Sequence, residues 1–150
     1  MVRPYAEEFI LQMSKYYEIV MFTASISKYA SPIFNKLDRE RKCQGMLFRE
    51  HCVIDPKTGY MVKDLTKLGR KIEDIIILDN SPNSYHYQPE NALPSKTWLK
   101  DPQDFELKDM VAFLRKLAEP EVKDVRHYLS KVVDITQGSK LPIFNRRKAI

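Results

Sequence analysis

The sequence contains little glycine and little cysteine. Its 150 residues include four glycines, two cysteines and one tryptophan. With so few glycines it has neither a G-x-G-x-x-G motif nor a P-loop, which makes a nucleotide-binding Rossmann-like enzyme a weak interpretation. Cys43 and Cys52 are too few for a disulfide framework, so we interpret both as free thiols and expect Cys52 to be half-buried on a strand. A reducing compartment is the expected environment.

Long hydrophobic runs are also missing. No apolar stretch approaches the roughly 18 residues that a membrane-spanning helix needs, and residues 1–4 do not open a signal peptide. We therefore expect no membrane segment in this chain. The net charge of +5 favours acidic partners, phosphorylated ones included, although a solvated basic surface explains it better on composition alone. The densest basic cluster, residues 146–148, has no interleaved aromatic residues, so we expect no direct contact with nucleic acid.

The pattern of apolar residues predicts an α/β domain. Apolar residues make up 43% of the chain and charged residues 30%, a mixture typical of one compact globular domain. Short runs of β-forming residues alternate with segments of helical periodicity, which predicts a Rossmann-like, mainly parallel sheet. We expect buried strands at 17–22 and 75–78. Helices are expected at 4–14, after Ser25, at 105–117 and at about 122–132. In the second helix Tyr29, Ile33 and Leu37 form the expected apolar face, and Asp104 is the expected N-cap of the third.

A different pattern occurs between Met46 and Lys63. Three short β-like runs lie there, at 46–48, 52–54 and 60–62, and the Asp-Pro-Lys-Thr-Gly segment between the last two is a turn signal. We predict that residues 46–63 form a small antiparallel hairpin or sheet inserted in the domain. The domain is expected to cover residues 1–132, followed by a tail at 133–150 that is irregular or partly disordered.

Polar residues follow the two strongest strand patterns. Thr23 ends the first strand before a helix, and Asp79 and Asn80 end the second. In an open α/β sheet, ligands bind beyond the carboxyl ends of the strands. A threonine at a helix start suits a phosphate, Lys63 can neutralise a phosphoryl oxygen, and the oxygens of Asp79 and Asn80 suit Mg²⁺. Taken singly, these residues are better explained as a helix cap, a surface charge and a turn. Taken together, they indicate a phosphoryl-transfer site.

Short motifs between residues 3 and 130 are collinear with those of one enzyme family. They are similar to the motifs of the small phosphatases that act on the C-terminal domain of RNA polymerase II. This family, also called the NLI-interacting-factor-like or FCP-homology phosphatases, belongs to the haloacid-dehalogenase superfamily. The matching motifs are Arg3-Pro4, Phe22-Thr23-Ala24-Ser25, Lys28-Tyr29-Ala30, Leu47-Phe48-Arg49-Glu50, Val62-Lys63-Asp64-Leu65, Leu68-Gly69-Arg70, Ile77-Leu78-Asp79-Asn80-Ser81-Pro82, Asn91-Ala92, Trp98 and Asp104-Phe105-Glu106-Leu107.

The resemblance implies a Mg²⁺-dependent protein serine/threonine phosphatase with the haloacid-dehalogenase fold. Thr23 would hold the transferring phosphoryl group, and Lys63 would bridge this group and the nucleophilic aspartate. Asp79 and Asn80 would hold Mg²⁺, directly or through water.

The resemblance also implies a phosphorylated protein or peptide as substrate and a nuclear or cytoplasmic location. Arg49 and Tyr29 are similar to family residues that line the peptide-binding groove beside the inserted hairpin. A salt-bridged arginine and a tyrosine at the edge of the core explain these two residues equally well.

The paired aspartates that define the family are absent. In the family, a D-x-D-x-[T/V] motif at the end of the first strand supplies the nucleophile of an aspartyl-phosphate and a general acid and base. No D-x-D occurs in this sequence. The family's first strand lies between the strands that end here at Thr23 and Asp79. We therefore expect this chain to lack the central strand, to be inactive as written, and to be a fragment of a longer protein.

A second interpretation is a non-catalytic peptide-binding module of the same fold. Such a module would be a pseudophosphatase or would resemble the inactive receptor subunit of the mitochondrial inner-membrane translocase. The inserted hairpin with Phe48, Arg49 and Tyr60 could hold a peptide without chemistry. Affinity for a peptide that ignores phosphorylation and Mg²⁺ would favour this interpretation.

Overall fold

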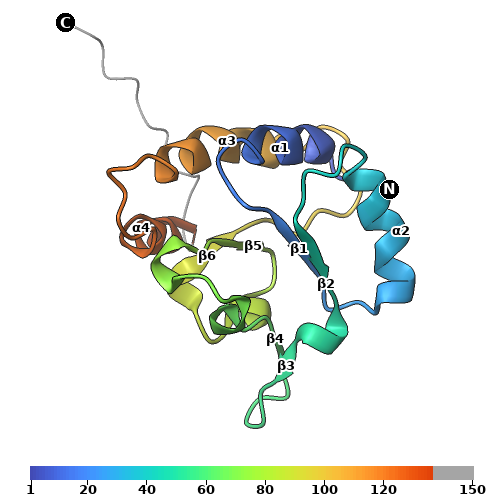
Figure 1. Cartoon of the computed structure of the whole chain (residues 1–150), viewed down its shortest axis with the longest axis horizontal. Coiled ribbons are helices and arrows are strands. Elements are labelled where there is room, and N and C mark those ends of the chain that lie inside the picture. Colours follow the sequence, from blue (N-terminus) through green and yellow to red (C-terminus); the bar gives the residue numbers. More distant parts are fainter. Residues whose placement is uncertain (137–150) are drawn as a thin grey trace, which may run out of the picture.

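The computed structural model describes the backbone of residues 1–136 and the side chains of residues 1–132. The predicted tail at 133–150 therefore lies outside the described residues, apart from the backbone of 133–136. The described elements are the helices α1 (Ala6–Met13), α2 (Ser27–Leu37), α3 (Glu106–Leu117) and α4 (Arg126–Thr136), the strands β1 (Val20–Phe22), β2 (Gly45–Leu47), β3 (Val53–Ile54), β4 (Met61–Val62), β5 (Ile77–Asp79) and β6 (Ala92–Pro94), and short 3₁₀ helices at Arg49–His51, Leu65–Leu68, Ile72–Asp74, Pro82–Tyr85 and Pro89–Asn91 (Figure 1).

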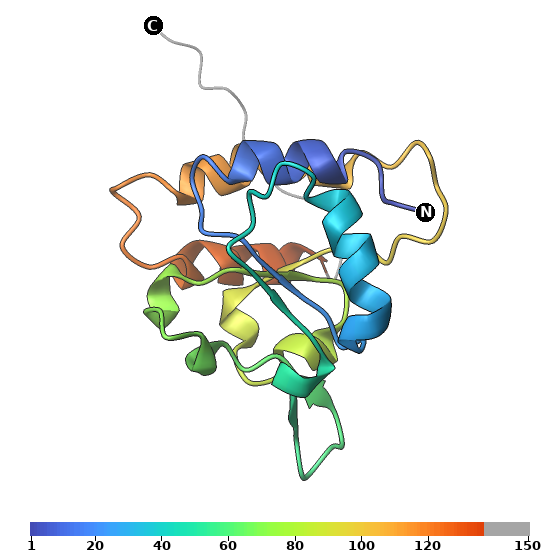
Figure 2. The ribbon, with the colours of Figure 1, turned by 45° about the vertical axis from the view of Figure 1, so that its right-hand side comes forward.

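The strands form three separate two-stranded sheets. β1 pairs with β2 and β5 pairs with β6, both in parallel, whereas β3 and β4 form an antiparallel hairpin. The hairpin projects from the rest of the domain, and α2 lies on the outer side of the β1–β2 pair (Figures 1 and 2). The expected mainly parallel sheet is thus present as two parallel pairs, with helices α1 and α3 side by side along one side of the domain.

The main hydrophobic core lies between α1, α3, α4 and β6. Helix α3 contributes residues spaced three or four apart, which places them on one face. Helix α4 contributes Val125 just before its start, together with Leu129 and Val132. The predicted helices at 105–117 and 122–132 are therefore confirmed in position, although α4 begins at Arg126 and continues to Thr136. The buried members of this core are Met13, Leu93, Leu107, Met110, Phe113, Leu114, Leu117, Val125, Leu129 and Val132.

The apolar face expected for α2 is wrong. Tyr29 is 68% exposed and Ile33 is 52% exposed, while Ala30 is buried and Phe34 and Leu37 are half-buried. Two sets of residues with helical spacing exist in this helix, and periodicity alone does not say which one faces the sheet. The packed set contains the small Ala30, which lets the helix approach the strands.

The inserted element is smaller than predicted. Residues 53–54 and 61–62 form the expected hairpin, and the turn between them is closed by Asp55, which accepts a hydrogen bond from Thr58 N at 2.9 Å. Gly59 takes a φ of +73°, which glycine adopts without steric cost. Residues 45–47, however, are not part of the insertion, because β2 pairs with β1 in the main fold. A short apolar run does not reveal which strand it will pair with.

Two further local features differ from the predictions. The three-residue strand β6, which lies before Trp98, was not predicted, because it is too short to leave a pattern. Phe105 rather than Asp104 is the N-cap of α3. The Asp104 carboxylate forms a bidentate contact with Arg3 and also accepts a hydrogen bond from Glu106 N at 3.3 Å.

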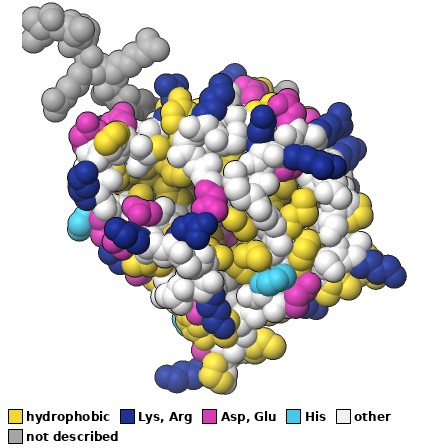
Figure 3. All heavy atoms as spheres, in the orientation of Figure 1, with side chains coloured by type: hydrophobic (Ala, Val, Ile, Leu, Met, Phe, Trp, Pro, Cys, Tyr) yellow, Lys and Arg dark blue, Asp and Glu magenta, His cyan; other side chains and the backbone are white. Residues whose placement is uncertain are grey.

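Strand β1 is less buried than predicted. Val20 is exposed, and Met21 and Phe22 are half-buried. Within residues 1–136, β1 has one strand neighbour, β2, and β5 likewise has one, β6. β1 and β5 therefore each have one edge with no strand beside it among these residues. Hydrophobic side chains are visible at the surface in the middle of the view in Figure 3.

None of the helices between residues 1 and 136 combines the length and the apolarity that a membrane crossing requires. Cys43 and Cys52 are both free, as predicted, and both are half-buried. The half-burial of Cys52 was expected, but Cys52 lies immediately before β3 rather than on a strand.

Candidate functional site at the carboxyl ends of the strands

A buried lysine joins three parts of the fold. Lys63 directly follows β4, and only 7% of the residue is exposed. Its Nζ donates to Asp79 Oδ2 at 2.5 Å and to Phe22 O at 2.8 Å, so it connects the ends of β5 and β1. The backbone N–H of Lys63 donates to Ser84 O at 2.8 Å, which holds the lysine in place. A lysine ammonium has three donors. Two are used here, and the third is available to a phosphoryl or carboxylate oxygen.

Phe22 O lies on the unpaired edge of β1. Thr23 N donates to Leu47 O and Gln44 N donates to Ile19 O, so the odd-numbered residues of this segment direct their backbone groups toward β2. Backbone groups alternate between the two edges of a parallel strand, so those of Val20 and Phe22 point the other way. In β5, Asp79 O accepts a hydrogen bond from Ser95 N, so the backbone carbonyl of Asp79 points toward β6. Lys63 therefore lies between the strand pairs, at their carboxyl ends.

Thr23 directly follows Phe22, the β1 residue whose carbonyl accepts a hydrogen bond from Lys63, and opens the loop that leads to α2. Its hydroxyl accepts a hydrogen bond from Ser25 N at 3.1 Å, which leaves the hydroxyl proton free to donate. Helix α2 begins at Ser27 behind Ile26, which offers no side-chain cap, and the first turn carries no acidic residue. Uncapped N–H groups at a helix start attract anions. The loop after β1 therefore contains a hydroxyl that can donate and leads to a helix start without a side-chain cap.

Asp79 and Asn80 end β5 with oxygen atoms. Asp79 Oδ1 accepts from Ser81 N at 2.8 Å, and Asn80 Nδ2 donates to Thr97 Oγ1 at 2.9 Å, so the Asn80 amide oxygen faces away from Thr97. Carboxylate and amide oxygens are the ligands that Mg²⁺ prefers. Among the residues with described side chains, no three histidine, cysteine or acidic residues cluster as a metal site. These two residues fit part of a magnesium site, and water or phosphate oxygens would have to complete it.

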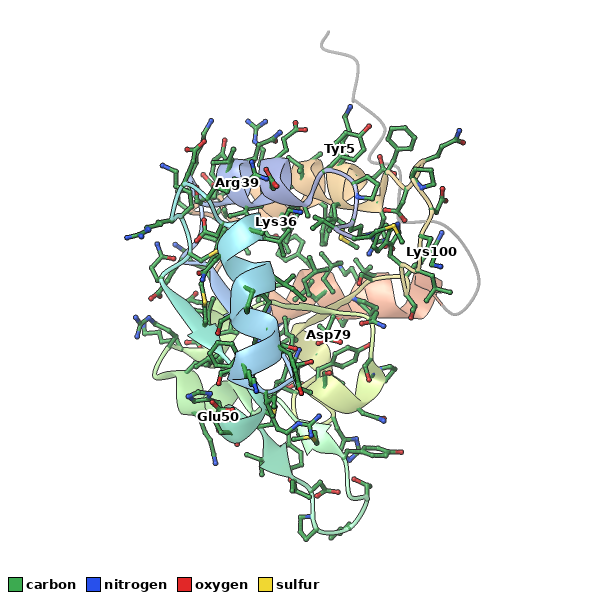
Figure 4. The ribbon with its side chains drawn as sticks, turned by 90° about the vertical axis from the view of Figure 1, so that its right-hand side faces the viewer. Tyr5, Lys36, Arg39, Glu50, Asp79 and Lys100 are labelled. Carbon is green, nitrogen blue, oxygen red and sulfur yellow. The ribbon has the colours of Figure 1, made fainter. Side chains whose placement is uncertain are left out.

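Arg49 and Tyr29 lie on two sides of the loop after β1. Arg49 Nε donates to Ala24 O at 2.7 Å and Arg49 N donates to Ser25 O at 3.0 Å, so this arginine holds the loop rather than a carboxylate. Tyr29 is exposed on α2 rather than at the edge of the core. Figure 4 shows Glu50 near the N-terminal end of α2. Thr23, Asp79 and Asn80 thus lie at the carboxyl ends of β1 and β5, Lys63 joins these two ends, and Arg49 holds the loop after Thr23, whereas Tyr29 is exposed on α2.

Sequence reasoning missed the role of Thr97 and of the contacts that hold its loop. Arg3 donates to Asp104 through Nε and Nη2, to Glu106, and to Lys96 O at 3.1 Å. The loop after β6 is thereby tied both to the N-terminal segment and, through Thr97, to Asn80. An isolated threonine in a loop gives no sequence signal for such a contact.

Neither cysteine is a candidate nucleophile. Burial raises the pKa of the Cys43 thiol to about 12, with further contributions from the charge and hydrogen bond of Asp38. Burial also raises the pKa of Cys52, although the charges of Lys63 and Arg49 oppose this. Because the thiolate is the reactive form, both side chains are unreactive near neutral pH.

Three similar proteins of known sequence are phosphatases by name. The human CTD small phosphatase-like protein is 44% identical over 128 residues, which are 85% of this chain and 46% of the relative. CTD small phosphatase-like protein 1 of Caenorhabditis elegans is 47% identical over 115 residues, which are 77% of this chain and 23% of the relative. The human carboxy-terminal domain RNA polymerase II polypeptide A small phosphatase 2 is 44% identical over 119 residues, which are 79% of this chain and 43% of the relative. The chain thus spans less than half the length of these relatives.

Two solved structures share the fold. They are the fission yeast RNA polymerase II CTD phosphatase Fcp1-R271A bound to beryllium fluoride, with a TM-score of 0.54, and Fcp1, an essential RNA polymerase II CTD phosphatase, with a TM-score of 0.55. Each is 15% identical to this chain. The match covers 87% of this chain and 38% of Fcp1-R271A, and 95% of this chain and 40% of Fcp1. The likeness shows that this chain shares their fold. The family model described as NLI interacting factor-like phosphatase matches residues 1–126, and the chain therefore belongs to this family of phosphatases.

Proposed function

We propose that this chain provides most of the active site of a Mg²⁺-dependent phosphatase that removes phosphate from serine or threonine in proteins. The observation that carries the proposal is the position of Lys63, whose Nζ touches both Asp79 and the unpaired edge of β1. A buried cation with one unused donor, placed beside a threonine hydroxyl and a helix start, suits a phosphoryl group better than it suits a purely structural role.

The missing nucleophile would enter on a strand between β1 and β5. Such a strand would find unpaired backbone groups on both sides, and strands lie about 4.8 Å apart in a sheet. Its carboxyl end would lie beside Lys63, where an aspartate would receive the unused donor. The first aspartate of a D-x-D motif would attack phosphorus and displace the substrate oxygen. The second would protonate that oxygen and then remove a proton from the water that hydrolyses the aspartyl-phosphate.

The residues of this chain would position the phosphoryl group during both steps. Lys63 would neutralise one phosphoryl oxygen, and the Thr23 hydroxyl would donate to another. Asp79 and Asn80 would hold Mg²⁺, which when bound screens the negative charges of carboxylate and phosphate from each other.

Arg49 and Tyr29 would contact the polypeptide around the phosphoresidue. Tyr29 exposes most of its ring beside the loop that Arg49 holds, and an exposed aromatic ring suits a peptide surface. The substrate class we propose is a phosphoserine peptide such as the C-terminal domain of RNA polymerase II, in line with the names of the relatives.

The test compares two proteins with an aryl phosphate and Mg²⁺. One is the chain as it stands, and the other carries an N-terminal extension with a D-x-D-x-T strand. We expect activity in the extended protein alone, its loss on replacing the first aspartate of the added motif by asparagine, and a loss of at least a hundredfold for Lys63→Ala. Activity of the unextended chain, or an extended and folded protein that is inactive, would overturn the proposal.

One observation favours a second function, binding without catalysis. Both oxygens of Asp79 accept hydrogen bonds, from Ser81 N and from Lys63, so the acid at the site is engaged and no other carboxylate contacts Lys63 within the described side chains. If the chain is a peptide-binding module, it should bind a serine peptide and its phosphorylated form equally well, with no effect of Mg²⁺. A phosphatase site requires the phosphorylated form to bind more tightly.

A further inference from the structure

The outward face of α2 carries an unusual stripe of apolar side chains. Ile26, Tyr29 and Ile33 are 39%, 68% and 52% exposed, respectively. Their spacing of three and four residues places them in one line along the helix. Large apolar residues scattered singly on a surface are normal, but a continuous line of them indicates a contact surface.

The charged residues that α2 itself places beside the stripe are both basic. Lys28 and Lys36 lie on the exposed side of α2, and the helix itself, Ser27–Leu37, contains no acidic residue. Neither lysine forms an ion pair with another residue whose side chain the structure describes. Glu40, just beyond the helix, is paired with Lys42 at 3.7 Å. The surface therefore offers apolar contacts and two uncompensated cations, which complement a segment that is both apolar and acidic.

The stripe runs away from the candidate site without a break. Ile26 is the N-cap residue of α2, three positions after Thr23, and Lys36 lies in the last turn of the helix. Figure 4 shows this helix facing the viewer, with Lys36 toward its C-terminal end. Ten residues of helix span about 15 Å, which an extended peptide covers with about five residues.

We propose that the outward face of α2 docks an acidic, apolar segment of the phosphoprotein substrate, about five residues from the phosphorylated residue. The apolar side chains of this segment pack on Ile33 and Tyr29, and its carboxylates approach Lys28 and Lys36. The identity of the docked segment as part of a substrate rests on the proposed phosphatase function. The existence of the surface itself, which extends two helical turns beyond Tyr29, is argued from the exposure and charge of its residues alone.

The test uses three fluorescein-labelled peptides without phosphate. In the first, phenylalanine and leucine alternate with aspartate and glutamate. In the second, serine replaces the apolar residues, and in the third, lysine replaces the acidic ones. Fluorescence anisotropy measures binding to the full chain. We expect the acidic apolar peptide to bind more tightly than the other two, and its affinity to fall about fivefold to tenfold in Ile33→Ser and in Lys36→Glu. Lys71→Glu is the matched control, because Lys71 is exposed near the start of β5, at the opposite end of the strands.

Equal affinity of all four proteins for the acidic apolar peptide would overturn the docking surface, and so would equal binding of the lysine peptide. Sedimentation of the wild type and Ile33→Ser checks a third outcome. If this substitution converts a dimer into a monomer, the stripe joins two copies of the chain and the proposal is wrong.

A short phosphoserine peptide without the acidic segment separates this proposal from the phosphatase proposal. Its binding should depend on Lys63 and not on Ile33. If it fails to bind while the acidic apolar peptide still binds through Ile33 and Lys36, the docking surface stands and the phosphatase assignment fails. The reverse result overturns the docking surface alone.

Discussion

Lys63 and Asp79 form a buried ion pair, with Nζ 2.5 Å from Oδ2, although they come from separate parts of the fold. Lys63 follows the inserted hairpin, whereas Asp79 ends β5 in the main fold. Since the same Nζ also donates to Phe22 O, one side chain ties the hairpin, β5 and β1 together. The pair therefore has a structural role as well as a place in the candidate site.

Removing one partner of this pair should destabilise the chain strongly. Lys63→Met leaves the Asp79 carboxylate buried without its cation, and we expect the free energy of unfolding to fall by about 3 kcal/mol. Lys63→Met combined with Asp79→Asn should cost less than the sum of the two single changes, by about 1 kcal/mol or more. Urea unfolding followed by circular dichroism measures all four proteins. Strictly additive effects would show that the two side chains are not coupled.

The contacts of Arg3 should make stability depend on pH. The Arg3 guanidinium, through its hydrogen bond, holds the pKa of Asp104 below its usual range. A carboxyl group with a lowered pKa stabilises the fold above the pKa of the unfolded chain and loses this contribution as the pH falls below about 4. We expect Arg3→Ala to lower the free energy of unfolding by about 2 kcal/mol at pH 7, and by less at pH 3.

Arg70→Ala is the control for Arg3→Ala. Arg70 forms a similar bidentate contact with Glu18, at 2.8 and 2.9 Å, but both side chains are exposed. Exposed ion pairs contribute little to stability, so this substitution should have a small effect. Equal losses in the two variants would contradict the role assigned to Arg3.

Cys43 should resist alkylation in the folded chain. Burial, followed by the charge and hydrogen bond of Asp38, raises its pKa to about 12, so almost no thiolate exists at pH 8. In a Cys52→Ser background, iodoacetamide should react with Cys43 far more slowly in buffer than in denaturing urea. Asp38→Asn should speed the reaction in buffer, since it removes the neighbouring charge.

The same raised pKa sets a pH limit on stability. The unfolded thiol ionises near pH 9, whereas the folded one stays neutral. The stability contributed by the neutral Cys43 is therefore present below about pH 9 and is lost as the pH rises toward 12. Cys43→Ser should flatten the fall in unfolding free energy between pH 9 and 10.5, and an unchanged slope would count against the assigned pKa.

Exposure predicts that two aliphatic residues on helices contribute very differently to the free energy of unfolding. Leu129 on α4 is 0% exposed, and Leu129→Ala should lower the free energy of unfolding by about 3 kcal/mol. Ile33 on α2 is half exposed, and Ile33→Ala should change it by no more than about 0.5 kcal/mol. Thermal and urea unfolding of the two variants checks the assignment. A large loss for Ile33→Ala would mean that this side chain is buried in solution.

Local patterns were sufficient where local chemistry decides the structure. The Asp55–Gly59 turn was predicted correctly, because the Asp55 carboxylate and the positive φ of Gly59 act within five residues. Helix α3 was also predicted, since its apolar residues recur at helical spacing on one face and that face is buried. Its N-cap is Phe105 rather than the predicted Asp104, whose carboxylate contacts Arg3, 101 positions earlier in the chain.

Pairing over long distances was not predictable in the same way. The run at 45–47 looks like the other two short runs of the insertion, yet it joins β1 instead. In α2, two sets of residues have helical spacing, and packing buries the one that contains Ala30 and leaves Tyr29 and Ile33 in solvent.

The sequence by itself determined the approximate positions of the four helices, the polar residues that end β1 and β5, and the resemblance of the motifs to one phosphatase family. These properties depend on residue type and on spacing along the chain. The tertiary structure alone decided that the strands form two parallel pairs, that Lys63 joins Asp79 to the unpaired edge of β1, and that α2 turns an apolar stripe outward. The reason is physical: a backbone edge, a buried charge and a helix face acquire their partners only when distant segments are brought together.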